Sequence, residues 1–236
     1  MRQRTIDLET PDGAMPLYEA VPENPRGAVI VFQEAYGVNA YIEDVCGRLA
    51  GEGYHAVAPH LFHRTGGGVV SYGDMGKAIE MIGTLSDDGM LADADAAIAH
   101  LGAAGFAMPR IGTVGFCMGG RTTFLVCARR AIGAGVGFYG GGIVTSHFPQ
   151  LPSLAGEAPT MKAPWLGLFG DKDPSIPVAD VERLRDVLHD SPFDAEVVRY
   201  PDAGHGFHSD QRDSYVPEAA ADGWQRCLAW FARHLR

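Results

Sequence analysis

The chain has 236 residues, and its 19 lysines and arginines against 29 aspartates and glutamates give a formal net charge of −10. A chain of this length can bury a full hydrophobic core within one domain. The acidic balance, without a basic stripe to neutralise phosphates, argues against nucleic acid or an anionic membrane as a partner.

The cysteines and the first residues bear on the cellular compartment. The four cysteines are widely spaced and fit no Cys-x-x-Cys pattern, so free thiols in a reducing environment are expected. No apolar run reaches the ~18 residues of a transmembrane helix, and residues 1–7 lack the apolar stretch of a secretory signal. We therefore expect a cytoplasmic protein, either monomeric or homodimeric.

Strand and helix signals alternate along the chain. Segments 5–9 and 15–21 flank the turn-forming Pro11-Asp12-Gly13 and predict an opening hairpin. Continuous apolar runs then predict buried strands, and apolar side chains at helical spacing predict helices. In chain order we predict a strand over 27–32, a helix from the N-cap Asn39, a strand over 54–59, a helix over 86–103, a strand over 111–115, a helix over 122–131, strands over 135–139 and 164–169, a helix over 178–188, a strand over 196–200 and a last helix over 217–235.

This alternation predicts an α/β fold, with a mostly parallel sheet covered by helices on both faces. No linker or repeat divides the sequence, so we expect one domain over residues 1–236. In such sheets the functional site lies at the carboxyl ends of the strands, which directs attention to the loops that follow them.

Cys117 follows one of these strands, in the segment Gly-Phe-Cys-Met-Gly-Gly at 115–120. A strand, a sharp turn and a helix are the context of a nucleophile elbow, here with Cys in the place usually held by Ser. The glycines allow helix and strand to approach closely, and the helix N-terminus favours a thiolate. The alternative is that Cys117 is a small buried core residue in an ordinary strand–helix turn.

Two later loops supply partners for a nucleophile. Asp171 and Asp173 follow the strand over 164–169, and His205 follows the strand over 196–200 between two glycines. The chain order is therefore nucleophile, acid, histidine, as in α/β-hydrolases. An imidazole takes the nucleophile's proton, and a carboxylate fixes the tautomer of that imidazole. Taken singly, the aspartates could be helix caps and the histidine a solvated turn residue.

Together these segments resemble the dienelactone hydrolase family over nearly the whole chain. The matching segments are 32–39 (Phe-Gln-Glu-Ala-Tyr-Gly-Val-Asn), 115–120, 170–177 and 204–207. The resemblance implies a single-domain α/β-hydrolase with the triad Cys117, Asp173 and His205, and it makes Asp171 a loop-shaping neighbour. It also implies hydrolysis of a lactone or ester through an acyl-enzyme, as by a carboxymethylenebutenolidase, without a cofactor.

The resemblance also implies roles for the loop after the strand over 27–32. The family's glutamate, matched by Glu34, helps to deprotonate the thiol once an anionic substrate has displaced its ion-pair partner. The backbone N–H groups of Ala35 and Met118 would form the oxyanion hole. Glu34 could instead be a partly exposed loop acid.

Substrate binding is where the sequence departs from the family pattern. The resemblance implies two arginines for a substrate carboxylate, and Arg64 matches the first. Arg64 could instead be an exposed loop cation. The second is expected just past the histidine, where His208 and Ser209 stand; Arg212 is near but not at the matching spacing. Tyr139, at the end of the strand over 135–139, is a further candidate for the pocket wall, with a packing role as the alternative.

Two alternatives to a dienelactone-type hydrolase stay open. The chain could be a general carboxylesterase for neutral esters, or a thiol-sensing or binding module without turnover. A metal site is not expected, because the pairs His60/His63 and His205/His208 have no third-ligand pattern such as His-Glu-x-x-His.

Overall fold

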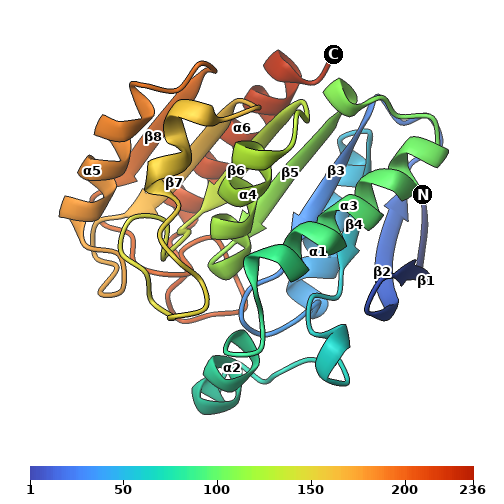
Figure 1. Ribbon diagram of the computed structural model, residues 1–236, viewed down its shortest axis with the longest axis horizontal. Helices are drawn as coiled ribbons and strands as arrows, with labels where there is room; N and C mark the ends of the chain where they lie inside the picture. Colours follow the sequence, from blue (N-terminus) through green and yellow to red (C-terminus); the bar gives the residue numbers. More distant parts are fainter.

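One eight-stranded sheet organises the chain in the computed structural model, which describes residues 1–236 (Figure 1). The strand order is β1-β2-β4-β3-β5-β6-β7-β8. The hairpin β1–β2 and the pair β2–β4 are antiparallel, and all other neighbours are parallel. The strands are β1 (Arg2–Thr10), β2 (Gly13–Val21), β3 (Gly27–Phe32), β4 (Tyr54–Pro59), β5 (Ile111–Phe116), β6 (Ala134–Phe138), β7 (Trp165–Gly170) and β8 (Ala195–Tyr200).

Helices cover both faces of this sheet, so the predicted fold class is confirmed. In Figure 1 helices α3, α4 and α5 lie on the face turned to the viewer, and α1 and α6 lie behind the strands. Every residue of the central strands β3, β4, β5, β6 and β7 is buried, as their continuous apolar runs predict. The helices are α1 (Ala40–Gly51), α2 (Met75–Ile82), α3 (Asp87–Ala103), α4 (Met118–Arg129), α5 (Val178–Leu188) and α6 (Pro217–His234).

Helix starts follow the capping signals in the sequence. The side chain of Asn39 accepts a hydrogen bond from the N–H of Ile42 at the start of α1, as predicted. Ser86 accepts one from Gly89 at the start of α3. No helix is both long enough and apolar enough to cross a bilayer.

Two segments differ from the predicted elements. Helix α4 begins at Met118 rather than Thr122, because the glycines that follow Met118 belong to its first turn. Helix α2 lies in a stretch for which no helix is predicted. Its eight residues are too short for a clear periodic signal.

The register of the parallel strands brings the loops after five of them to one edge of the sheet. Phe32 pairs with Gly115, and Phe116 pairs with Phe138, so the ends of β3, β5 and β6 are level. On the far side Gly170 at the end of β7 pairs with Tyr200 at the end of β8. The expected site residues follow these strand ends.

Candidate active site

Cys117 occupies a strained turn between β5 and α4. Its φ of 56° and ψ of −118° lie in a region that non-glycine residues rarely adopt, at a cost of about 1–3 kcal/mol. The neighbouring glycines make the turn possible, because a Cβ on Gly119 would lie 2.2 Å from the carbonyl oxygen of Phe32. The sequence prediction of an elbow is therefore supported by the backbone itself, and the thiol lies at the N-terminus of α4.

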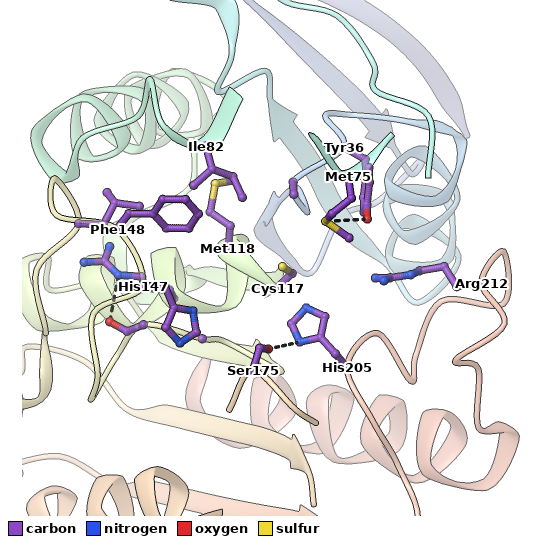
Figure 2. A pocket seen from close by; sticks show the side chains of 15 residues that line it. Tyr36, Met75, Ile82, Cys117, Met118, His147, Phe148, Ser175, His205 and Arg212 are labelled. Atoms are coloured by element: carbon purple, nitrogen blue, oxygen red, sulfur yellow. Dashed lines mark hydrogen bonds between the residues drawn. The ribbon is translucent and has the colours of Figure 1, made fainter. Parts of the chain in front are cut away.

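Asp173 and His205 form a hydrogen-bonded pair beside this turn. His205 Nδ1 lies 2.6 Å from Asp173 Oδ2. The other carboxylate oxygen of Asp173 accepts hydrogen bonds from the N–H and the hydroxyl of Ser175, at 2.8 and 2.6 Å. Asp173 is thus fixed on both oxygens, and in Figure 2 the ring of His205 faces Cys117.

The charges of this group shift the pKa values of its members. Burial lowers the pKa of His205, but the adjacent Cys117 and the hydrogen-bonded Asp173 outweigh it and raise the pKa to about 10. Burial raises the pKa of Asp173, but hydrogen bonds from His205 and Ser175 more than offset this and hold it below its usual value. The charged form of the imidazole is therefore favoured.

Asp171, the other aspartate of the acid loop, is turned away from the histidine. Arg199 donates from Nε and Nη2 to its two carboxylate oxygens, each at 2.7 Å. This bidentate pair joins the end of β7 to β8. The geometry agrees with a loop-shaping role for Asp171 and leaves Asp173 as the partner of His205.

Glu34 is fully buried and is held by two side chains. Arg212 Nη1 donates to its Oε1 at 3.3 Å, and the hydroxyl of Tyr72 donates to Oε2 at 3.2 Å. Burial raises the pKa of Glu34, while Arg212, His205 and Tyr72 act in the opposite direction without cancelling the rise. Glu34 is thus not an exposed loop acid: it is a carboxylate whose basicity depends on its partners.

Arg212 is the arginine beside Glu34, although its spacing from His205 did not predict it. Arg121 also lines the cavity, but Asp87 binds its guanidinium. Its guanidinium lies 5.6 Å from the ring centre of Tyr36 and 5.5 Å from that of Tyr72. The approach requires a glycine after the histidine, since a Cβ on Gly206 would lie 2.5 Å from Arg212 Nη1. The side chain is 17% exposed, which leaves room for a ligand to reach it.

Arg64, the arginine expected to bind the substrate, lies elsewhere. Nη1 and Nη2 bind the two carboxylate oxygens of the buried Asp93, at 2.8 and 2.9 Å, and Nε binds Asp12 at 2.7 Å. Arg64 is absent from the residues that line the active-site cavity. The prediction for Arg64 is corrected: two aspartates from other parts of the chain hold its guanidinium away from the site.

Tyr139 is also displaced from its expected place. It is fully buried, has a φ of 39°, and packs its ring 5.1 Å from that of His205. It does not line the cavity, so its role is to pack against the ring of His205 and not to form the pocket wall.

The backbone N–H groups of Ala35 and Met118 are free to bind an oxyanion. Met118 is the first residue of α4, so its N–H has no acceptor within the helix. The N–H of Ala35 donates to no protein atom among the hydrogen bonds of the structure. Both residues line the cavity together with Cys117, as the expected oxyanion hole requires.

The cavity over Cys117 encloses about 230 Å³ and is largely apolar. In Figure 2 Arg212 lies on one side of Cys117, while Ile82 and Phe148 lie on the other. The cavity therefore has a cationic end and an apolar end, with the thiol between them. Its lining residues are Ala35, Tyr36, Met75, Ile82, Cys117, Met118, Arg121, Gly141, Gly142, His147, Phe148, Leu151, Ser175, His205 and Arg212.

Sequence reasoning missed three residues of the site. Ser175 binds the acid, Tyr72 binds Glu34, and Arg212 provides the positive charge. The serine lies two residues after Asp173, and such a turn signal could have identified it. Tyr72 gave no signal, because its segment carries no motif.

The chain is similar to known proteins over nearly its whole length. The model of the dienelactone hydrolase family matches residues 15–235. A Methylorubrum extorquens protein named "Putative carboxymethylenebutenolidase" is 38% identical over 233 residues, which cover 97% of this chain and 80% of the relative. A protein of the same name from Escherichia coli is 39% identical, over 93% of this chain and 83% of the relative.

Solved structures extend the likeness to the backbone. The crystal structure of a "Putative Dienelactone Hydrolase" from Klebsiella pneumoniae superposes with a TM-score of 0.89 at 38% identity, covering 99% of each chain. A dienelactone hydrolase-like promiscuous phosphotriesterase from metagenomic libraries superposes with a TM-score of 0.80 over the whole of both chains; at 23% identity it shows a common fold alone. The chain belongs to the dienelactone hydrolase family.

Proposed function

We propose that the protein hydrolyses a lactone or carboxylic ester through a thioester formed on Cys117, as a carboxymethylenebutenolidase-like enzyme. The observation that carries the proposal is that Cys117 and His205 line one cavity with the free backbone N–H groups of Ala35 and Met118, and that Asp173 binds His205 from outside the cavity. The family membership supports lactone or ester hydrolysis as the reaction class.

In the first half of the proposed reaction, the sulfur of Cys117 attacks the substrate carbonyl carbon. The developing oxyanion accepts hydrogen bonds from the N–H groups of Ala35 and Met118, a contribution typically on the order of 3 kcal/mol per donor. The imidazolium of His205 gives its proton to the leaving alkoxide oxygen as the C–O bond breaks. In a lactone this oxygen stays attached to the acyl group, so nothing leaves the site.

In the second half, His205 takes a proton from a water molecule that attacks the thioester carbonyl. The C–S bond breaks, the thiolate re-forms, and the carboxylic acid departs. Asp173 holds the imidazole by Nδ1 throughout, so that Nε2 faces the reaction. Ser175 fixes Asp173 by two hydrogen bonds and so positions the pair.

Glu34 and Arg212 would couple this chemistry to an anionic substrate. A substrate carboxylate that draws Arg212 away removes the charge that most lowers the pKa of Glu34. Glu34 then becomes a stronger base in a buried setting, accepts the proton of the Cys117 thiol before the attack, and returns it to the thiolate when the product departs and Arg212 pairs with Glu34 again. Two observations support this coupling: Arg212 pairs with Glu34 at 3.3 Å, and its side chain is 17% exposed, so that a substrate carboxylate can reach it. In the sequence, only one of the two arginines of the family pattern was matched, which had weakened the case for an anionic substrate.

Neutral esters are a second candidate class of substrate. The apolar end of the cavity, with Ile82, Phe148 and Leu151, suits an uncharged acyl group or alcohol. Such substrates would be cleaved by the same thiol without the help of Arg212. A panel of esters that differ only in one carboxylate separates the two candidates.

The test of the catalytic thiol uses aryl-ester and enol-lactone hydrolysis by wild type, Cys117→Ala and the matched control Cys127→Ala. Cys127 is a buried thiol on the same helix, outside the cavity. We expect activity to be lost in Cys117→Ala alone, and the mass of an acyl group to appear on wild type during turnover. Equal hydrolysis by Cys117→Ala and wild type would refute the proposal. Absence of turnover with rapid oxidation of Cys117 would favour a thiol-sensing module.

All four cysteines are free thiols, and the proposed reaction needs Cys117 reduced. We therefore propose a reducing compartment, the cytoplasm, as the place of action.

A further inference from the structure

A second group of reactive side chains lies at the other end of the sheet from β8. Glu19 of β2, His55 of β4 and His100 of α3 converge there, with ligand atoms that all lie within 4.8 Å of one another. Their positions 19, 55 and 100 are too far apart in the sequence to form a recognisable motif. Figure 1 shows α3 passing across the strands at this side of the sheet.

The three side chains share one atom as their focus. His55 Nε2 lies 3.3 Å and His100 Nε2 lies 3.0 Å from the same oxygen, Oε2 of Glu19. In a tetrahedral zinc site with bonds of 2.0–2.1 Å, ligand atoms lie roughly 3.3 Å apart. The two distances to Glu19 are close to that value, and all three ligand atoms lie within 4.8 Å of one another, so side-chain rotations would open a ligand-lined position between them.

We propose that Glu19, His55 and His100 form a binding site for a zinc-type divalent cation, separate from the catalytic cavity. Two imidazoles and one carboxylate are a ligand set that Zn²⁺ takes in proteins, with water in the fourth position. The side chain of His100 is 20% exposed, which gives the ion and its water a path to solvent, while Glu19 is 1% exposed.

The surroundings of Glu19 orient the carboxylate for this role. Arg4 Nε donates to Oε1 at 2.6 Å, which leaves Oε2 for the two imidazoles. Such a partner behind a metal ligand fixes its orientation. The nearby positive charge of Arg4 works against this role, because it repels the cation and weakens binding.

A bound ion would join three distant parts of the fold. It would hold the N-terminal hairpin, through β2, to β4 and to the last turn of α3. The expected consequence is a stabilised structure with unchanged chemistry at Cys117, because none of the three residues lines the catalytic cavity.

The experiment is a Zn²⁺ titration of the untagged full chain after treatment with a chelator, followed by competition with a chromogenic chelator. The Cys117→Ala background prevents zinc from binding the catalytic thiol. We expect one Zn²⁺ per chain and an increase in the midpoint temperature of unfolding on zinc addition. Glu19→Gln and His100→Ala should each weaken binding by at least about tenfold and remove the increase in that temperature. His189→Ala, an exposed histidine far along the chain, is the matched control and should bind as tightly as its parent.

Arg4→Gln gives a result that a purely structural hydrogen-bond network does not predict. It keeps a donor for Oε1 and removes the nearer of two repelling charges, since Arg2 Nη2 also lies 3.8 Å from this oxygen, so zinc should bind more tightly than to its parent. The proposal is overturned if the chain binds no stoichiometric zinc, or if binding survives in both Glu19→Gln and His100→Ala. In the latter case the ion is held elsewhere, and the three residues form only a hydrogen-bonded clasp.

Discussion

Removal of the Arg212 charge gives the most informative test of the active site. In Arg212→Met the fully buried Glu34 keeps only Tyr72 as a partner. At 3.3 Å and an effective dielectric constant of about 20, the attraction that is lost is about 5 kcal/mol. Breaking buried pairs by removal of one partner costs about 3–5 kcal/mol. Because Glu34 can escape part of this cost by taking a proton, we expect a loss near 3 kcal/mol at pH 7.

Chemical denaturation measures this loss as a change in the free energy of unfolding. Burial already raises the pKa of Glu34, and without Arg212 it rises further. The loss should therefore shrink as the pH falls and the carboxylate becomes protonated. The double variant Glu34→Gln with Arg212→Met is the matched control, and it should recover most of the lost stability because no unpaired charge remains.

The effect of Arg212→Met on catalysis is measured by kcat/KM for two esters that differ by one carboxylate. A charge-assisted hydrogen bond of about 1.5–3 kcal/mol corresponds to a decrease of roughly 10- to 100-fold in kcat/KM for the anionic ester. The neutral ester should change much less. Equal decreases for both esters, or an unchanged free energy of unfolding, would refute the reasoning that links Arg212 to Glu34 and to an anionic substrate.

Three further predictions concern the triad, the elbow and the misassigned arginine. Asp173→Asn should lower kcat by roughly 10³- to 10⁴-fold. It should also move the alkaline limb of the pH–rate profile, expected near the His205 pKa of about 10, to lower pH, because the Asp173 carboxylate helps to raise that pKa. An alkaline limb at the same pH as in wild type would contradict this. Gly119→Ala should lower the free energy of unfolding by at least about 2 kcal/mol in denaturation experiments, because its Cβ would lie 2.2 Å from the oxygen of Phe32; a variant as stable as wild type would be against a crowded elbow. Arg64→Met should lower stability by about 3 kcal/mol while kcat/KM for the anionic ester stays unchanged, and a selective loss for that ester would restore Arg64 as a substrate ligand.

The sequence predicted the parts of the site that depend on local pattern. The apolar runs predicted the central strands, and the glycines around Cys117 predicted the elbow, because both signals are contained in a few consecutive residues. The position of Arg212 could not be predicted in this way. Consecutive turns after His205 fold the loop back, with Ser209 donating to the carbonyl of Gly206 and Arg212 donating to that of Ser209. A residue seven positions beyond the histidine thereby returns to Glu34.

Arg64 failed for a different physical reason. Its place after β4 is compatible with the active site, but Asp93 of α3 is buried and binds the guanidinium through both oxygens. A side-chain pair between distant segments is invisible to spacing rules. The same holds for the group of Glu19, His55 and His100, which only the packing of α3 on the sheet brings together.

The loop between β8 and α6 carries both the imidazole of His205 and the guanidinium of Arg212, joined through the close approach at Gly206. The residue that transfers protons and the residue that binds the anion therefore belong to one loop, and a change in that loop affects both. An engineer who wishes to change which acids the enzyme accepts should transplant the whole segment 204–212 between relatives, because an insertion within it would displace the receptor relative to the shuttle.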